Sequence, residues 1–264
     1  MSTFTPAASI DEVLAALDAI IDRAYEERDR AGYFASLYRG VTTAVKAGIA
    51  SGSFEDGPRM QRLDVVFANR YLDALHRYRS GEPLSLCWRA AFDAVKHRRV
   101  VIVQHLLLGM NAHINLDLGI AAAEVCPGSA LPGLEQDFNA INTVLASLET
   151  GVEAEVCSLS PWIDRLDHVD PNAGRVVANF SIDRARECAW RTAQRLSVLE
   201  GAERDAAIAE IDAEIALLAH LVERPVGVAI NLNLVLVRLR EVWDVRKVIR
   251  TLYGREPVGL SPKS

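Results

Sequence analysis

The chain has 264 residues, of which 50% are hydrophobic, 6% aromatic and 24% charged. This is an ordinary globular composition, and it excludes wholesale disorder. The net charge of −6 argues against the basic surface that nucleic-acid-binding proteins normally carry, so we expect no nucleic acid as a partner. At about 150 residues per domain, the length allows one large domain or two small ones.

The N-terminal residues and the cysteines indicate the compartment. The first residues, MSTFTPAASIDEV, lack the basic and apolar regions of a signal peptide. The four cysteines are widely separated and form no CxxC pair, so they predict neither a disulfide framework nor a structural zinc site. We therefore expect a cytoplasmic protein of bacterial type with reduced thiols.

Two stretches are apolar enough to be considered as membrane spans. Residues 100–123 include histidines, asparagines and an aspartate. Residues 226–237 are too few to cross about 30 Å of hydrocarbon, and they carry Asn231 and Asn233. Because polar groups at this density are costly in lipid, we expect both stretches to be buried helices and no membrane to be a partner.

Helical periodicity dominates the rest of the chain. A capping box formed by Ser9 and Glu12 predicts an amphipathic helix that begins at Ile10. Turn-forming residues then separate the later helices from one another. We expect these helices at about 32–50, 59–79, 84–98, 100–122, 134–148, 179–199, 203–222 and 226–253, with a short helix after Ser160 and a turn at 170–174.

The pattern contains no alternating run long enough to predict a strand, so the expected fold is all-α. The chain also lacks a clear linker, which favours one multi-helix domain over residues 1–264. We expect that domain to surround a central buried helix at about 100–122. The C-terminal tail, about 255–264, is expected to be flexible.

Residues 104–119, QHLLLGMNAHINLDLG, carry the candidate chemistry. They include no Lys, Arg or Glu, yet they place polar side chains on two faces of the expected helix. Because surface helices use charged residues, such a helix is expected to be buried with its polar groups satisfied internally. One stripe holds His105, Gly109, His113 and Asp117, and the nearly opposite stripe holds Gln104, Asn111 and Asn115.

His113 and Asp117 are four residues apart, so their side chains are expected to meet. This spacing suits two ligands of one divalent metal, or an Asp that orients a His for proton transfer. His105 lies about 12 Å from His113 along the axis, too far to share one ion. It would serve a second ion, a substrate or a structural hydrogen bond. The gap at Gly109 would admit a ligand or a neighbouring helix.

A metal site needs further ligands, because one helix supplies two and catalytic sites usually need three or more. Asp137 is the candidate third ligand for Zn, Mn, Fe or Mg. Its alternative role is that of a carboxylate in the first turn of its helix. Asp64 shares a helix face with Phe67 and Tyr71, so it is either partly buried or paired with an arginine on a neighbouring helix.

The sequence HINLDL at 113–118 has an echo in AINLNL at 229–234, which lacks the ionisable pair. If the echo is a real repeat, Asn231 and Arg238 share a face of the second helix and would line the same pocket. Chance similarity between two apolar helices is the favoured explanation.

Three segments together resemble a known family: GYFASLYRGVT at 32–42, LDVVFANRYLDA at 63–74 and QHLLLGMNAHINLDLG at 104–119. The family is uncharacterised, mainly bacterial and all-helical, with an Asn-Ala-His-Ile-Asn-x-Asp-Leu signature, and it is described only as a domain of unknown function. The resemblance covers residues 30–150 and, more loosely, most of the chain. It implies a soluble helical protein and supplies no activity or cofactor.

Two functions from different classes fit these observations. The first is an enzyme, a hydrolase or a biosynthetic lyase or cyclase, acting on a small, largely apolar molecule between the central helices. The second is a non-catalytic ligand-binding or assembly protein whose buried polar residues only fix helix register. A homo-oligomer is left open. In the enzyme, the catalytic residues would be His113, Asp117 and His105, and the substrate-binding residues Gln104, Asn111, Asn115, Asn231 and Arg238.

Overall fold

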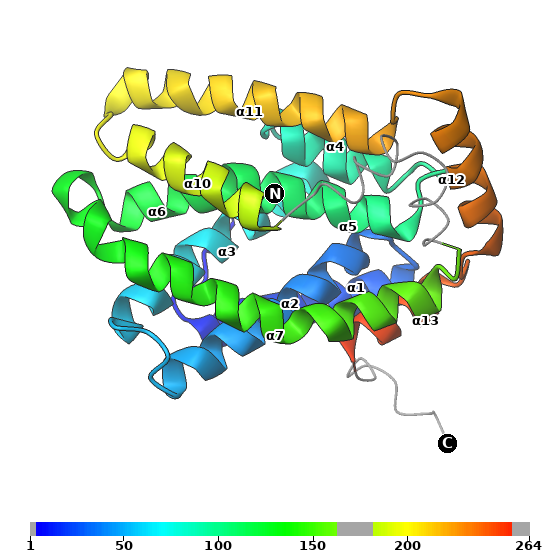
Figure 1. The fold of residues 1–264 in the computed structure, drawn as a ribbon, viewed down its shortest axis with the longest axis horizontal. Helices are drawn as coiled ribbons and strands as arrows, with labels where there is room; N and C mark the ends of the chain where they lie inside the picture. The colour runs from blue at the N-terminus through cyan, green and yellow to red at the C-terminus, as the bar shows by residue number, and fades with distance from the viewer. Residues whose placement is uncertain (1–3, 163–181, 255–264) are drawn as a thin grey trace.

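A computed structural model of the chain describes residues 4–162 and 182–254. Within these ranges there is no strand, which confirms the all-α prediction. The expected helix after Ser160, beyond residue 162, the turn at 170–174 and the C-terminal tail lie outside the described residues. The elements are α1 (Ile10–Glu27), α2 (Ala31–Ala50), α3 (Gly57–Ser80), α4 (Leu86–Ala94), α5 (Ile102–Met110), the π-helical η1 (Asn111–Leu118), α6 (Gly119–Val125), the 3₁₀ helix η2 (Gly128–Leu134), α7 (Glu135–Leu159), α10 (Ile182–Leu196), α11 (Gly201–Glu223), α12 (Val228–Arg240) and α13 (Val245–Tyr253) (Figure 1).

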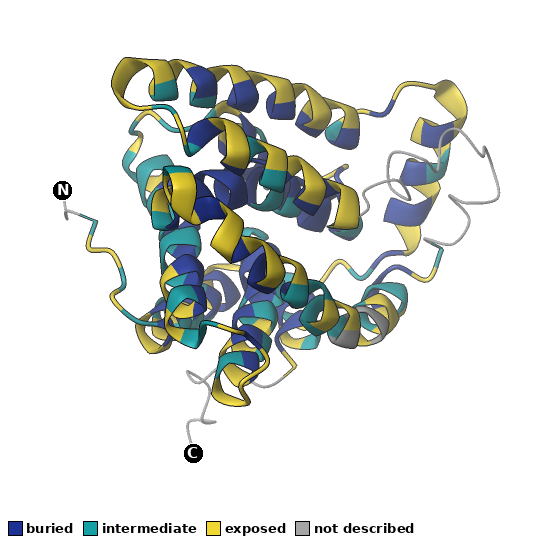
Figure 2. Ribbon diagram, turned by 60° about the vertical axis from the view of Figure 1, so that its left-hand side comes forward, coloured by how far each residue is buried: buried dark blue, intermediate teal, exposed yellow. Residues whose placement is uncertain are grey.

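The expected central helix is the continuous run of α5, η1 and α6. It contacts α2 and α3 on one side and α10 and α11 on another, with α4 also packed against it (Figure 1). Ile102–Val125 is the one described helix that is by itself long and apolar enough to span a membrane, and 89% of its most apolar stretch is buried inside the fold. Figure 2 shows the buried residues on the inward helix faces and the exposed residues on the outward faces.

Helix α1 begins at the predicted N-cap residue, Ser9, although the Glu12 side chain binds one residue before Ser9 and so does not complete the capping box. The Ser9 hydroxyl oxygen accepts from the Glu12 N–H at 3.2 Å. The Glu12 carboxylate in turn accepts from the Ala8 N–H at 2.8 Å. Two N–H groups at the start of the helix are thereby satisfied, which fixes where the helix begins.

The helix expected at 226–253 is in fact two helices, and the first is not buried as expected. The Asp244 carboxylate accepts from the Arg246 N–H at 3.0 Å and begins α13. In α12, the outward residues Val228, Leu232 and Leu239 are 87%, 59% and 62% exposed. The reason is that α12 packs by one side only, through Ile230, Leu234 and Val237. With α11, to which it is bent by 68°, it also passes the length and composition test for a membrane span.

Gly109 is the point of closest packing between α5 and α2. A Cβ atom built at Gly109 would lie 2.5 Å from ring carbons of Phe34. The gap expected at this glycine is therefore filled by the aromatic ring of a neighbouring helix, which is one of the two outcomes that the sequence left open.

We predict that Gly109→Ala destabilises the fold by about 1–3 kcal/mol, because the added methyl group overlaps the Phe34 ring. The matched control is Gly40→Ala in α2, where a Cβ atom meets nothing within 4 Å. That substitution is expected to stabilise the helix by about 0.5–1 kcal/mol. Urea unfolding measures both variants, and equal effects would contradict the close packing.

Candidate functional site

The two ionisable residues of the central helix lie in its π-helical segment. Residues Asn111–Leu118 form this segment, and it contains both His113 and Asp117. A π-helical turn is wider than an α-helical turn because each N–H reaches back five residues, and such segments occur frequently at functional sites. Helices α3, α4, α10 and α11 all contact η1, so the unusual geometry is enclosed by the fold.

Asp117 is a buried carboxylate, 2% exposed, held by donors from two other helices. Its Oδ1 accepts from Arg70 Nε of α3 at 2.9 Å, and its Oδ2 accepts from Trp88 Nε1 of α4 at 2.8 Å. A buried carboxylate needs such a charged partner and such hydrogen bonds to remain ionised. Neither donor was predictable from helical spacing, because both are distant from Asp117 in the chain.

His113 lies beside Asp117 in an aromatic cage. Its Nδ1 is 3.4 Å from Asp117 Oδ2, longer than the roughly 2.7–3.2 Å of a well-formed hydrogen bond. Its ring stacks on the Phe67 ring at 3.6 Å between centroids and meets the Tyr38 ring edge-on at 4.4 Å. Burial lowers the pKa of His113, and the Asp117 carboxylate opposes this effect. The imidazole is therefore neutral at pH 7.

The buried polar atoms around this cage that have no hydrogen-bond partner in the described parts of the chain include His113 Nε2, Asp64 Oδ2 and the Tyr71 hydroxyl. Burial raises the pKa of Asp64 to about 7. Tyr38 links these groups. Its ring contacts His113, and the pKa of its hydroxyl is raised first by burial and then by the nearby Asp64 carboxylate. The sequence left two possibilities for Asp64, burial or an ion pair with an arginine of a neighbouring helix. Burial is confirmed, and no arginine of the described ranges pairs with Asp64.

A surface groove of about 450 Å³ reaches the edge of this site. Arg70, Trp88 and Asp117 are among its lining residues, together with Asn69 and Ser85. The Arg70 side chain is 30% exposed, whereas the Asp117 side chain is 2% exposed. Arg70 therefore stands between solvent and the buried carboxylate.

His105 lies apart from His113. Gly109 lies between them on the central helix, and the Phe34 ring of α2 packs against Gly109. Its own ring faces Tyr33 edge-on at 5.8 Å. Burial lowers the pKa of His105 to about 3, and the positive charges of Arg30 and Arg238 contribute to the same shift. The structure therefore gives His105 a neutral ring in a separate environment.

Two of the three polar residues of the second stripe, Gln104 and Asn111, bond to α11, and Asn115 supports Asn111 from the same helix. Gln104 Nε2 donates to the Val222 carbonyl at 2.6 Å, and its Oε1 accepts from the Val101 N–H at 3.0 Å. Asn111 Nδ2 donates to the Ile215 carbonyl at 3.2 Å, and Asn115 Nδ2 donates to Asn111 Oδ1 at 2.9 Å. These bonds tie the central helix to α11, as in the non-catalytic hypothesis.

Arg238 and Asn231 do not line a common pocket with His113. Arg238 is buried, where it donates to the Arg98 carbonyl at 2.7 Å and to the Glu241 carboxylate at 3.1 Å. Asn231 is exposed and donates to the Pro225 and Gly227 carbonyls at the start of its own helix. The two side chains were expected on one face of the helix, but Arg238 lies in the interior and Asn231 lies at the solvent-exposed surface.

Asp137 does not join the central pair either. Its carboxylate accepts from Arg59 Nη2 at 2.6 Å and from the Glu55 and Asp56 N–H groups at 2.7 and 3.1 Å. It therefore anchors the loop before α3 from the first turn of α7. Across residues 4–162 and 182–254, no three His, Cys, Asp or Glu side chains are grouped so as to hold one metal ion.

We predict that Arg70→Met destabilises the fold by about 1–3 kcal/mol, because it leaves the buried Asp117 carboxylate without its cation. The value is reduced for the partial exposure of Arg70. The control Arg77→Met on the same helix removes a half-exposed pair with Asp73 and is expected to change stability by less than about 1 kcal/mol. Equal losses in chemical denaturation would contradict the role of Asp117.

Asp64→Asn is expected to stabilise the fold near pH 8 and to have little effect near pH 4. Because the pKa of Asp64 is raised to about 7, the protonated carboxyl is the form that the fold favours. The protonated Asp64 carboxyl makes its full contribution to the free energy of unfolding below the ordinary Asp pKa of about 3.9. This contribution is lost as the pH rises through about 7. Asn carries no charge, so the gain near pH 8 is a few kcal/mol. Urea unfolding at both pH values measures it, with Asp73→Asn, at a half-exposed position of the same helix, as the control. A gain that is the same at both pH values would contradict the ionisation of Asp64.

Comparison with known proteins gives a family and no activity. A family model described as a family of unknown function (DUF5995) matches residues 10–225. Comparison with curated proteins and with solved structures found no match. The match includes the whole central helix and the elements that surround His113 and Asp117. The chain belongs to this family of unknown function.

Proposed function

We propose that the chain is an enzyme that transfers protons on a small, largely apolar molecule, with His113 as the general base. The observation that carries this proposal is the pair of buried ionisable groups around Tyr38. His113 has a lowered pKa and a free Nε2, and Asp64 has a pKa of about 7 and a free Oδ2 among the described residues. A general acid is most effective when its pKa lies near the working pH, as that of Asp64 does.

Asp117 is the positioning residue in this proposal. Its carboxylate faces His113 Nδ1, which leaves Nε2 as the nitrogen that accepts a proton from the substrate. Arg70 and Trp88 hold the two carboxylate oxygens, so the carboxylate stays in place beside His113. The 3.4 Å contact shortens when the imidazole becomes positive, as catalytic hydrogen bonds commonly do in the substrate complex.

The surroundings of His113 set the substrate class. Phe34, Phe67 and Trp88 line the cage with apolar rings, which favours a small molecule with an aromatic or aliphatic body. The groove at Arg70 reaches the edge of this cage, and we take it as the entrance for the substrate. Ester or lactone hydrolysis and elimination both need one base and one acid, so they are the reactions that we propose.

Proton transfer by side chains fits this site better than metal catalysis does. His113 and Asp117 supply two ligands to Zn, Mn, Fe or Mg, and both oxygens of Asp117 already accept hydrogen bonds. A catalytic metal usually takes three protein ligands. We also propose a cytoplasmic location, on the basis of four widely separated cysteines that form no CxxC pair.

The second candidate is a non-catalytic helical protein. It is favoured by one observation: the hydrogen bonds of Gln104 and Asn111 join the central helix to α11. In that case His113 serves packing alone, and its replacement costs a few kcal/mol of stability with no change in any conversion.

The test is conversion of a mixture of small aromatic and aliphatic esters, lactones and hydroxy ketones, followed by mass spectrometry. We expect one or more compounds to be converted by the unaltered protein, and the rate to fall about 10²–10⁴-fold in His113→Gln and in Asp64→Asn. The matched control is His220→Gln at an exposed position of α11, which is expected to keep the full rate.

The pH profile separates the two ionisable groups. The rate is expected to rise with pH as His113 loses its proton, and to fall above about pH 7 as Asp64 loses its own. A rate that survives in His113→Gln would overturn the proposal. Absence of any conversion, with or without added Zn²⁺ or Mn²⁺, together with a loss of stability in His113→Gln, would favour the non-catalytic protein.

A further inference from the structure

A second groove, of about 500 Å³, lies between α1 and α3, apart from the acid/base site. Residues 4–7 form its third wall. Asn69 of α3 holds this segment, because its Oδ1 accepts from the Ala7 N–H and its Nδ2 donates to the Ala7 carbonyl, both at 2.8 Å. Pro6 lines both this groove and the groove at Arg70, so the segment separates the two.

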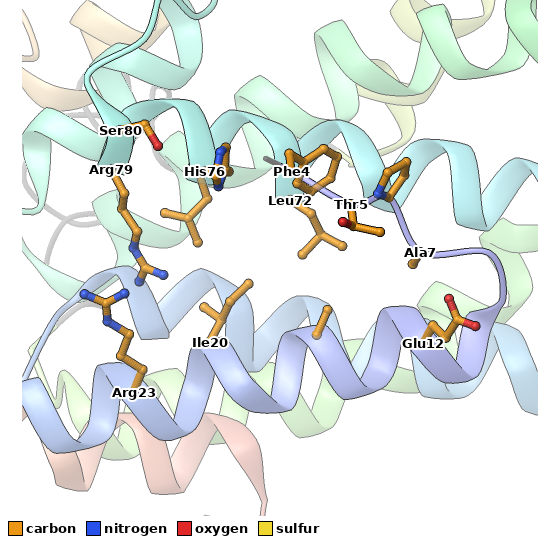
Figure 3. A pocket seen from close by; sticks show the side chains of 13 residues that line it. Phe4, Thr5, Ala7, Glu12, Ile20, Arg23, Leu72, His76, Arg79 and Ser80 are labelled. Carbon is orange, nitrogen blue, oxygen red and sulfur yellow. The ribbon is translucent and has the colours of Figure 1, made fainter. Parts of the chain in front are cut away.

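The middle of the groove is apolar. Ile20 projects from α1 and Leu72 from α3, and the Phe4 ring lies beside them (Figure 3). Leu72 and Leu75 are nearly buried and form the floor. The volume lies within the range of about 300–1,000 Å³ that is typical of small-molecule sites.

One end of the groove is basic. Arg23 of α1 and Arg79 of α3 point their guanidinium groups toward one another across it, with His76 on the same helix as Arg79 (Figure 3). Arg79 forms no ion pair with any residue that the structure describes, and Arg23 uses only its Nε, at 2.9 Å from Glu27. Two facing guanidinium groups repel each other, and an anion between them would accept hydrogen bonds from both.

The opposite end is acidic. Glu12 precedes Arg23 by eleven residues on α1, or about 16 Å along the helix axis. Its carboxylate accepts from the Ala8 N–H at 2.8 Å, so it is fixed in place. An anionic head group is therefore directed to the arginines, and an uncharged tail runs toward Glu12 along the apolar floor.

We propose that this groove binds an amphiphile with one anionic head group, a carboxylate or a phosphate monoester, and an unbranched aliphatic tail. The charge of the two arginines selects the head, and Ile20, Leu72 and Phe4 bury the tail. This site is separate from the acid/base site, so the proposal does not rest on the function of His113.

Calorimetric titration below the micellar concentration tests the proposal with four probes: dodecanoate, dodecyl phosphate, dodecanol and acetate. We expect the first two to bind and the last two to bind at least tenfold more weakly. Tighter binding of dodecanoate identifies a fatty acid, and tighter binding of dodecyl phosphate identifies a phosphate-headed lipid.

The double variant Arg23→Gln/Arg79→Gln is expected to weaken dodecanoate at least tenfold, and Ile20→Gln to weaken it as well. Arg89→Gln, at an exposed position of α4, is the matched control and is expected to leave the Kd unchanged. Far-ultraviolet circular dichroism verifies that each variant is folded, and both arginines are exposed, so the double variant is expected to fold. Equal binding of dodecanol, an unchanged Kd in the double variant, or no binding of either anion would overturn the proposal.

Discussion

The ion pair between Arg70 and Asp117 is the constraint on which the centre of this fold depends. A helix without Lys, Arg or Glu between residues 102 and 119 buries readily, but it carries one carboxylate into the interior. An isolated buried charge of this kind costs several kcal/mol, and only a cation and hydrogen bonds from outside the helix offset that cost. Arg70 of α3 and Trp88 of α4 supply them, so the positions of three helices are coupled through one side chain.

This coupling explains why His113 stands in an aromatic cage. Arg70 and Phe67 are three residues apart on α3, so neighbouring faces of one helix deliver the guanidinium to Asp117 and a ring to His113. The imidazole is desolvated on both faces and remains neutral. A neutral imidazole with one nitrogen toward a carboxylate and the other free is the arrangement that general bases use.

The sequence was sufficient for features that depend on local patterns and insufficient for those that depend on distant partners. Periodicity predicted an all-α fold and a buried helix near residues 100–122, and the capping box at Ser9 predicted the start of α1. The partners of Asp117 lie on helices far apart in the chain, and the exposed side of α12 depends on which other elements pack against it. The break after Arg240 had a local signal, the N-cap residue Asp244, which the long apolar pattern concealed. Asp137 shows the reverse error, since its type suggested a metal ligand and its contacts make it a loop anchor.

Helix α3 contributes residues to both of the sites that we propose. Because the helix repeats every 3.6 residues, it presents different side chains on three of its faces. Its inward face carries Asp64, Phe67 and Tyr71 to the cage around His113. A second face carries Arg70 to the entrance groove, and a third carries Leu72 and His76 to the groove beside α1. Residues 4–7 cross between the last two faces and are held there by Asn69. Because Pro6 lines both grooves, the two sites share one wall, and the bonds of Asn69 to Ala7 fix that wall in place.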